Sequence, residues 1–305
     1  MKFSSVCKTS LLFVSLVVEN AVGENLRSLS PKKQPLVDLD ETCVGLIGTV
    51  QYDAEADPSA RDTEFLACQT PSGLHYRVEA SKDWIEEKMS TGELKSGKTL
   101  LTFPAGTKID KSRGRIQNFA PPGLAKREET PEEIEVRSRR RLATGTRSVL
   151  IVRVIAAGGS VATTASQDRL SDSIFGNGLD GTVDPVTLKS QFADCSNNQL
   201  NFVPTSDRSS VLAGTPSITN GSTTVTISTQ TSVGEGQMEL DVTARLKQQF
   251  GVTSPSLLAD HVMYCLPPNT FVNGGIGYAY INSWNSVYND NWCTYVSIQM
   301  HELGE

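Results

Sequence analysis

The chain has 305 residues and a net charge of −6, and 38% of its residues are hydrophobic and 20% charged. This composition is typical of a globular protein and excludes a collagen-like, coiled-coil or wholly disordered chain. Because no basic stripe interleaved with aromatic residues is present, we expect no nucleic-acid partner.

The first 23 residues have the pattern of a secretory signal peptide. Lys2 and Lys8 precede an apolar run from Leu11 to Val18, and small residues stand at Ala21 and Gly23, where a signal peptidase acts. The alternative, an N-terminal membrane anchor, is disfavoured because the apolar run is too short for a hydrocarbon core of about 30 Å. We therefore expect a secreted, extracellular protein with no membrane association after signal cleavage.

Residues 24–125 are predicted to be a β-rich propeptide domain. Apolar or alternating runs bounded by Gly, Pro and Asp predict short strands, and the run from Asp83 to Met89 predicts a helix. The predicted strands are Cys43 to Tyr52, Glu64 to Cys68, Leu74 to Glu79 and Thr99 to Phe103. A small antiparallel barrel or sandwich fits this pattern best.

A charged linker, residues 126–141, follows the predicted propeptide. Residues 24–141 contain 20 acidic and 19 basic residues among 118, whereas residues 142–305 contain 13 and 7 among 164. The linker ends in four arginines, Arg137, Arg139, Arg140 and Arg141. They resemble the recognition sequence of furin-type convertases, so we expect such a convertase to be the processing partner. The alternative is a solvated basic patch.

Residues 142–305 alternate strands with helices, which predicts an α/β segment with a mixed sheet and packed helices. The predicted strands are Arg147 to Ala156, Gln199 to Val203, Thr223 to Ser228, His261 to Leu266 and Ile276 to Asn282. The predicted helices are Ala165 to Phe175, Asp184 as N-cap to Cys195, and Met238 to Phe250. Trp292, Val296, Met300 and Leu303 have helical spacing and predict the apolar face of one more helix.

Secretion determines how the cysteines are interpreted, because disulfides persist outside the cell. Cys43 and Cys68 lie close together in the sequence and are predicted to pair. Three cysteines, Cys195, Cys265 and Cys293, remain in the last segment; their pairing stays open, since an odd number cannot pair completely.

Two further residue types are candidates for modification or chemistry. Asn220 begins an Asn-Gly-Ser sequon, which predicts a glycosylation site on a surface loop. The sequence has three histidines. His75 and His261 are interpreted as surface or strand-end residues, whereas His301 is followed by Glu302 beside the apolar face of the last predicted helix.

Residues 146–305 contain, in this order, the runs Thr146 to Val154, Leu188 to Phe192, Asp260 to Pro268, Tyr278 to Trp284 and Met300 to Gly304. Together these runs resemble the gametolysin family of secreted zinc metallopeptidases, which belong to the metzincins. The resemblance implies a zincin-like fold in which His301 is the first zinc ligand and Glu302 the general base of an H-E-x-x-H motif. It also implies an extracellular or cell-wall glycoprotein as substrate, and places Gly275 to Trp284 near the substrate cleft.

The sequence departs from the family pattern after Glu302. Glu305 stands where the second histidine is expected, and the third histidine and the Met-containing turn do not occur. Glu305 shares a helical face with His301 and is a weak candidate ligand, but catalytic zinc normally has three protein ligands. We therefore expect residues 142–305 to be the N-terminal part of a peptidase domain, inactive as written. The alternatives are a non-catalytic secreted binding module and a truncated remnant on a peptidase-like fold.

Overall fold

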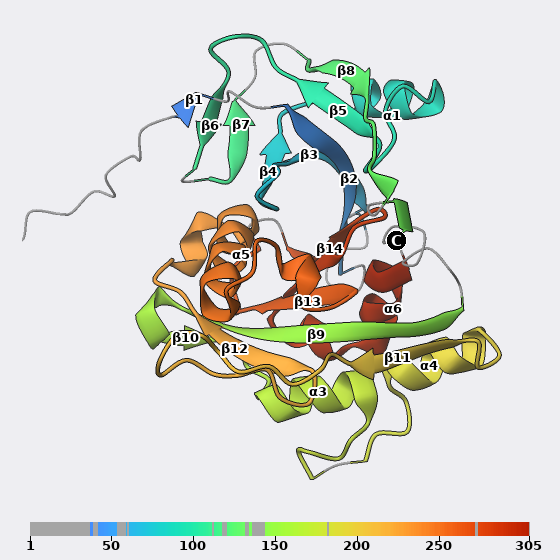
Figure 1. Cartoon of the computed structure of the whole chain (residues 1–305), viewed down its shortest axis with the longest axis vertical. Coiled ribbons are helices and arrows are strands. Elements are labelled where there is room, and N and C mark those ends of the chain that lie inside the picture. Colours follow the sequence, from blue (N-terminus) through green and yellow to red (C-terminus); the bar gives the residue numbers. More distant parts are fainter. Residues whose placement is uncertain are drawn as a thin grey trace, which may run out of the picture. The chain divides into compact units, whose positions relative to one another are not determined.

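The computed structural model describes residues 37–38, 42–53, 59, 61–111, 113–117, 121–131, 134–135, 144–181, 183–271 and 274–304. The predicted signal peptide and the four arginines of the expected processing site lie outside the described residues. The described residues form a mixed α/β structure around one large mixed sheet (Figure 1).

The N-terminal segment, residues 42–126, consists mainly of short strands. Its longest strand, β2 (Cys43–Tyr52), pairs antiparallel with β3 (Thr63–Gln69) and with β5 (Thr99–Thr102). The other elements are β4 (His75–Val78), α1 (Lys82–Ser90), β6 (Lys108–Asp110), β7 (Arg115–Gln117) and β8 (Gly123–Lys126); β1 (Val37–Asp38) pairs with β6. The strands predicted in this segment are present, whereas β6, β7 and β8 were not predicted.

The C-terminal segment, residues 144–304, is organised around the long strand β9 (Gly145–Ala156). Three strands pair with it in parallel: β11 (Leu200–Pro204), β12 (Ser222–Thr226) and β13 (His261–Leu266). The short β10 (Val161–Ala162) pairs with it antiparallel. Beyond β13 lie β15 (Asn285–Asn289), which is parallel to β13, and β14 (Gly275–Tyr280), which is antiparallel to β15.

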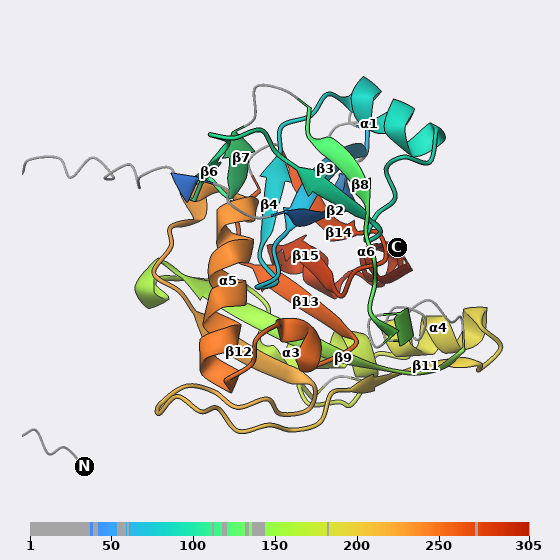
Figure 2. The same cartoon turned by 45° about the horizontal axis from the view of Figure 1, so that its top comes forward.

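Helices cover both faces of this sheet (Figures 1 and 2). They are α3 (Gln167–Phe175), α4 (Leu188–Cys195), α5 (Glu235–Phe250) and α6 (Val296–Gly304). Successive side chains of a strand point to opposite faces of a sheet. Accordingly, Leu150 and Val152 of β9 belong to the apolar cluster that includes α5, whereas Val149 and Ile151 belong to the cluster that includes α3 and α4.

The start of α4 differs from the sequence prediction. We expected Asp184 to cap this helix, but the helix begins at Leu188 with Thr187 as its N-cap. The Thr187 Oγ1 accepts a hydrogen bond from the Ser190 N–H at 3.2 Å, and the Ser190 Oγ accepts one from the Thr187 N–H at 2.9 Å. This reciprocal capping satisfies two N–H groups at once and outweighs the signal from Asp184 and Pro185.

The two segments share the sheet, because β2 of the N-terminal segment pairs antiparallel with β14 of the C-terminal segment. In Figure 2 β14 lies between β15 and β2. Apolar packing crosses the same boundary: Leu46 and Val50 of β2 belong to the cluster around α5, and Leu240 of α5 belongs to the core cluster of the N-terminal segment.

Candidate functional site

Helix α6 carries the His-Glu pair singled out in the sequence. His301 is exposed, whereas Glu302 is only 3% exposed. The buried face of α6 consists of Gln299, Glu302 and Leu303. The predicted apolar face is confirmed for Leu303, which is buried, and for Met300, which packs partly buried against the same core cluster. It is wrong for Trp292, which lies in a preceding 3-10 turn, and Val296 is half-buried.

Gln299 is buried because the fold supplies partners for its amide. Its Nε2 donates to the Cys293 carbonyl at 2.6 Å and to the Ser173 Oγ at 3.3 Å. The amide nitrogen is therefore satisfied inside the fold, whereas the Gln299 Oε1 is buried without a hydrogen-bond partner among the described residues.

Glu302 lies against β14, an internal strand that pairs with β15 on one side and with β2 on the other. A Cβ atom added to Gly277 of β14 would lie 3.3 Å from the Glu302 Oε1, so the absence of a side chain at residue 277 leaves room for this carboxylate. Glu302 also lines a cavity of about 20 Å³, which is the size of one water molecule. The other residues that line the cavity are His261, Tyr280, Ser283, Trp284, Asn285, Ser286 and Leu303.

The described residues do not fit a zinc site by themselves. Within them, no group of three or more His, Cys, Asp or Glu side chains is close enough to hold a metal ion. His301 and Glu302 are neighbours on α6 but differ in exposure, and Glu305 lies outside the described residues. One histidine and one carboxylate do not hold catalytic zinc, which needs three protein ligands and an open position.

The remaining residues singled out in the sequence fall at separate places. Disulfides join Cys43 to Cys68 and Cys265 to Cys293, and Cys195 is an exposed free cysteine at the end of α4. Asn220 is exposed in a turn with a φ of 50°. None of these residues lines the cavity beside Glu302.

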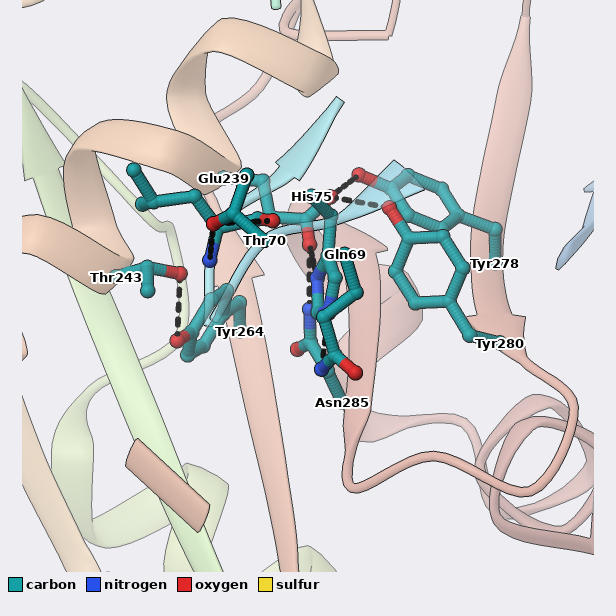
Figure 3. A network of polar contacts seen from close by, with 10 residues as sticks. Gln69, Thr70, His75, Glu239, Thr243, Tyr264, Tyr278, Tyr280 and Asn285 are labelled. Atoms are coloured by element: carbon teal, nitrogen blue, oxygen red, sulfur yellow. Dashed lines mark hydrogen bonds and ion pairs between the residues drawn. The ribbon is translucent and has the colours of Figure 1, made fainter. Parts of the chain in front are cut away.

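The sequence analysis missed a buried polar network centred on Glu239 of α5 (Figure 3). Glu239 is 1% exposed. Its Oε1 lies 2.7 Å from the His75 Nδ1 and accepts a hydrogen bond from the Asn285 Nδ2 at 2.6 Å. Its Oε2 accepts hydrogen bonds from the hydroxyls of Tyr278 and Tyr280 at 2.7 and 2.8 Å. Four side chains thus surround one buried carboxylate.

His75 corrects one interpretation made from the sequence. It does start a strand, as expected, but it is 3% exposed and not at the surface. Its Nε2 lies 3.0 Å from the Gln69 Nε2, an arrangement in which the amide donates and His75 carries its proton on Nδ1, toward Glu239. The signal that was available is the pair Tyr278 and Tyr280 on one face of a buried strand, because buried tyrosine hydroxyls need hydrogen-bond partners.

Further polar contacts join the two segments around this network. The Arg77 Nη2 lies 3.2 Å from the Glu235 Oε1, and the Arg77 guanidinium lies 5.3 Å from the centre of the Tyr278 ring. At an exposed position, the Lys247 Nζ donates to the Ser72 carbonyl at 2.6 Å. The boundary therefore combines a buried polar centre with more exposed contacts at its margin.

The network gives three tyrosines a large shift in pKa. Burial raises the pKa of Tyr264, Tyr278 and Tyr280 well above the ordinary 10.0, and the nearby Glu239 carboxylate raises it further. In the unfolded chain these tyrosines ionise near pH 10, so their contribution to stability is complete below that pH and is lost above it. We expect the free energy of unfolding to fall by about 1.4 kcal/mol per pH unit for each of them above pH ~10.

An alkaline titration followed by tyrosinate absorbance and far-ultraviolet circular dichroism checks this prediction. The three tyrosines are expected to ionise together with the loss of secondary structure, and Tyr278→Phe should reduce the amplitude of that cooperative step. Ionisation of all seven tyrosines in a gradual step, with the circular dichroism unchanged, would contradict it.

No protein-family model matches the chain, and neither a curated protein nor a solved structure matches it. Across the part of the chain that the structure describes, every helix is too short or too polar to cross a membrane. The two disulfides are compatible with an extracellular location.

Proposed function

We propose that the chain is a secreted protein of the gametolysin type whose C-terminal segment binds protein substrate at the β14 edge of the sheet. In this proposal, furin-type cleavage at Arg137 to Arg141 releases the N-terminal segment as a propeptide. The substrate is an extracellular or cell-wall glycoprotein. The fold is the zincin-like one that the sequence resemblance implies.

The observation that carries the proposal is the position of Glu302 next to β14. The resemblance assigns Glu302 the role of general base and places Gly275 to Trp284 at the substrate cleft. In agreement with that assignment, the Glu302 carboxylate lies against Gly277 and shares a cavity with Tyr280 and Trp284. β14 would become an edge strand once the N-terminal segment, with β2, is released. A strand at the edge of a sheet can pair with an extended peptide, which would bring the peptide backbone close to this carboxylate.

Only one zinc ligand is assigned to this chain. His301 would be the zinc ligand that α6 supplies, and zinc, when bound, would activate a water molecule. The described residues hold no group of three metal-binding side chains, and this observation favours the second candidate function, a non-catalytic secreted binding module. No hydrolytic step is therefore assigned to residues 144–304 alone.

Zinc binding separates the two candidate functions. We expect the unaltered chain to bind well below one zinc ion per molecule at micromolar zinc, because His301 has no second histidine four residues later. Glu305→His restores that spacing in the sequence and should tighten zinc binding at least ~10-fold. The measurement is equilibrium dialysis with metal analysis, in a Cys195→Ser background that removes the exposed thiol.

The control for this experiment is the double variant His301→Ala, Glu305→His, which should not show the gain in zinc affinity. Binding of nearly one zinc ion by the unaltered chain would refute the binding-module candidate. If Glu305→His gives no gain that depends on His301, α6 is not a metal-binding helix and the peptidase assignment fails.

A further inference from the structure

A cavity of about 600 Å³ lies beside α5, and neither Glu302 nor Glu239 lines it. Its volume is in the range of sites for small organic molecules, about 300 to 1,000 Å³. One face of α5 forms a wall, because residues three or four positions apart lie on the same side of a helix. The residues of this wall are Gln237, Leu240, Asp241, Ala244, Arg245 and Gln248.

The other walls of the cavity come from both segments of the chain. Leu74 and Tyr76 belong to the start of β4, and the exposed Lys111 follows β6. Residues 226–229, at the end of β12 and directly after it, complete the lining. The cavity therefore exists only where the N-terminal segment packs against α5 and β12.

Part of the lining is apolar. Leu74, Ile227 and Leu240 line the cavity, one each from the N-terminal segment, the residues after β12, and α5. A ligand with an apolar body would remove this surface from water, and such burial is favourable.

Arg245 supplies the lining with a cation that the fold does not neutralise. It is half-buried and, among the described residues, has neither a hydrogen-bond acceptor nor an ion-pair partner; its Nε is buried without one. Because guanidinium groups that lose contact with water are normally paired, Arg245 leaves a place for an acceptor in this cavity.

The nearest candidate partner of Arg245 within α5 is already engaged. Asp241 precedes Arg245 by four residues, a spacing at which the two side chains often pair. However, the Asp241 Oδ1 accepts a hydrogen bond from the Gln237 Nε2 at 3.0 Å, and its Oδ2 accepts one from the Thr229 hydroxyl. Asp241 is thus held by other donors.

Lys111 adds a second positive charge. It lines the same cavity and has no ion-pair partner among the described residues. Asp241 is the one acidic side chain in the lining, against the two cations Arg245 and Lys111. The lining therefore has an excess of positive charge in a chain whose net charge is −6, and this excess favours an anion as ligand.

We propose that this cavity binds an amphiphilic organic anion, a small molecule that carries one carboxylate on an apolar body. The carboxylate lies at Arg245 and Lys111, and the apolar body lies against Leu74, Ile227 and Leu240. A planar guanidinium matches a carboxylate with two parallel hydrogen bonds. The site involves neither zinc nor β14, so it stands or falls independently of the proposed function.

The test uses the full chain with an uncleaved linker and two fluorescent probes. Dansylglycine carries one carboxylate on an aromatic body, and its emission rises in an apolar site. Dansylglycinamide is the matched probe, in which a neutral amide replaces the carboxylate. We expect dansylglycine to bind at least ~10-fold more tightly than dansylglycinamide, because only its carboxylate pairs with the guanidinium.

A matched pair of variants locates the binding. Arg245→Gln should weaken binding of dansylglycine at least ~10-fold and leave binding of dansylglycinamide unchanged. Its urea midpoint should equal that of the unaltered chain, because Arg245 has no partner to lose. Arg169→Gln replaces an arginine of α3 that lies 3.5 Å from Asp180 and outside this cavity, and should change the affinity for neither probe.

Three results would overturn the proposal. They are the absence of dansylglycine binding, equal affinities for the two probes, and dansylglycine binding that Arg245→Gln does not weaken. Ala244→Trp, which fills the cavity from α5, should abolish binding of both probes. If Ala244→Trp does not fold, the comparison of Arg245→Gln with Arg169→Gln decides.

Discussion

Glu239→Ala is expected to lower the free energy of unfolding by about 3 to 5 kcal/mol. The substitution leaves the two tyrosine hydroxyls, the Asn285 amide and the His75 imidazole without their common acceptor, in a place that water does not reach. Each buried donor without a partner costs about 1 to 3 kcal/mol, and partial rearrangement recovers some of the loss. Urea denaturation followed by tryptophan fluorescence measures the change.

Two further variants show whether the loss of stability in Glu239→Ala comes from the hydrogen-bond network around Glu239. Glu239→Gln keeps the shape and one acceptor oxygen, so its stability should lie between those of Glu239→Ala and the unaltered chain. Glu86→Ala removes a carboxylate from the exposed face of α1, where the side chain is 54% exposed, and should leave the denaturation midpoint unchanged. A Glu239→Ala protein as stable as the Glu86→Ala protein would refute the structural role of the network.

Leu150→Ala should lower the free energy of unfolding by about 2 to 5 kcal/mol. Leu150 is fully buried in the middle of β9, the strand with parallel partners on both sides, and it packs in one cluster with Val242 and Leu246 of α5. Truncation removes apolar contacts and leaves a cavity that a central strand cannot close by moving.

The control for Leu150→Ala is Val211→Ala, at a side chain that is 64% exposed. Val211→Ala should change the free energy of unfolding by no more than about 0.5 kcal/mol. Denaturation of both variants in urea gives the comparison. Equal stability of the two variants would mean that the α5 side of the sheet is not a packed core.

The elements that were predicted from the sequence are those whose pattern lies in consecutive residues of the chain. Residues 147–156 form a β-branched run without alternation, as expected for a strand that is buried on both faces, and β9 is such a strand. β15 was missed because Asn285 and Ser286 are polar, and a polar strand becomes favourable only when partners such as Glu239 supply hydrogen bonds. No local pattern contains that information.

The same distinction applies to the candidate site. The adjacency of His301 and Glu302 is a property of the sequence, but their different exposure depends on the packing of Gln299 and Leu303 against the sheet. The pairing of Val50 with Tyr278 was not predictable either, because it joins strands at opposite ends of the chain. Charge density distinguishes residues 24–141 from residues 142–305, whereas the sheet that the two segments share depends on tertiary pairing, which composition does not predict.

The long sequence distance between paired elements also affects how the chain is made. His75 and Glu239 are 164 residues apart. At a synthesis rate of about 5 to 20 residues per second, His75 therefore waits about 8 to 33 s for Glu239 to be translated, and β2 waits longer for β14. During this interval the unpaired edge of β2 is a template for wrong association with other nascent chains. The N-terminal strands therefore stay open to such association until the last third of the protein has emerged.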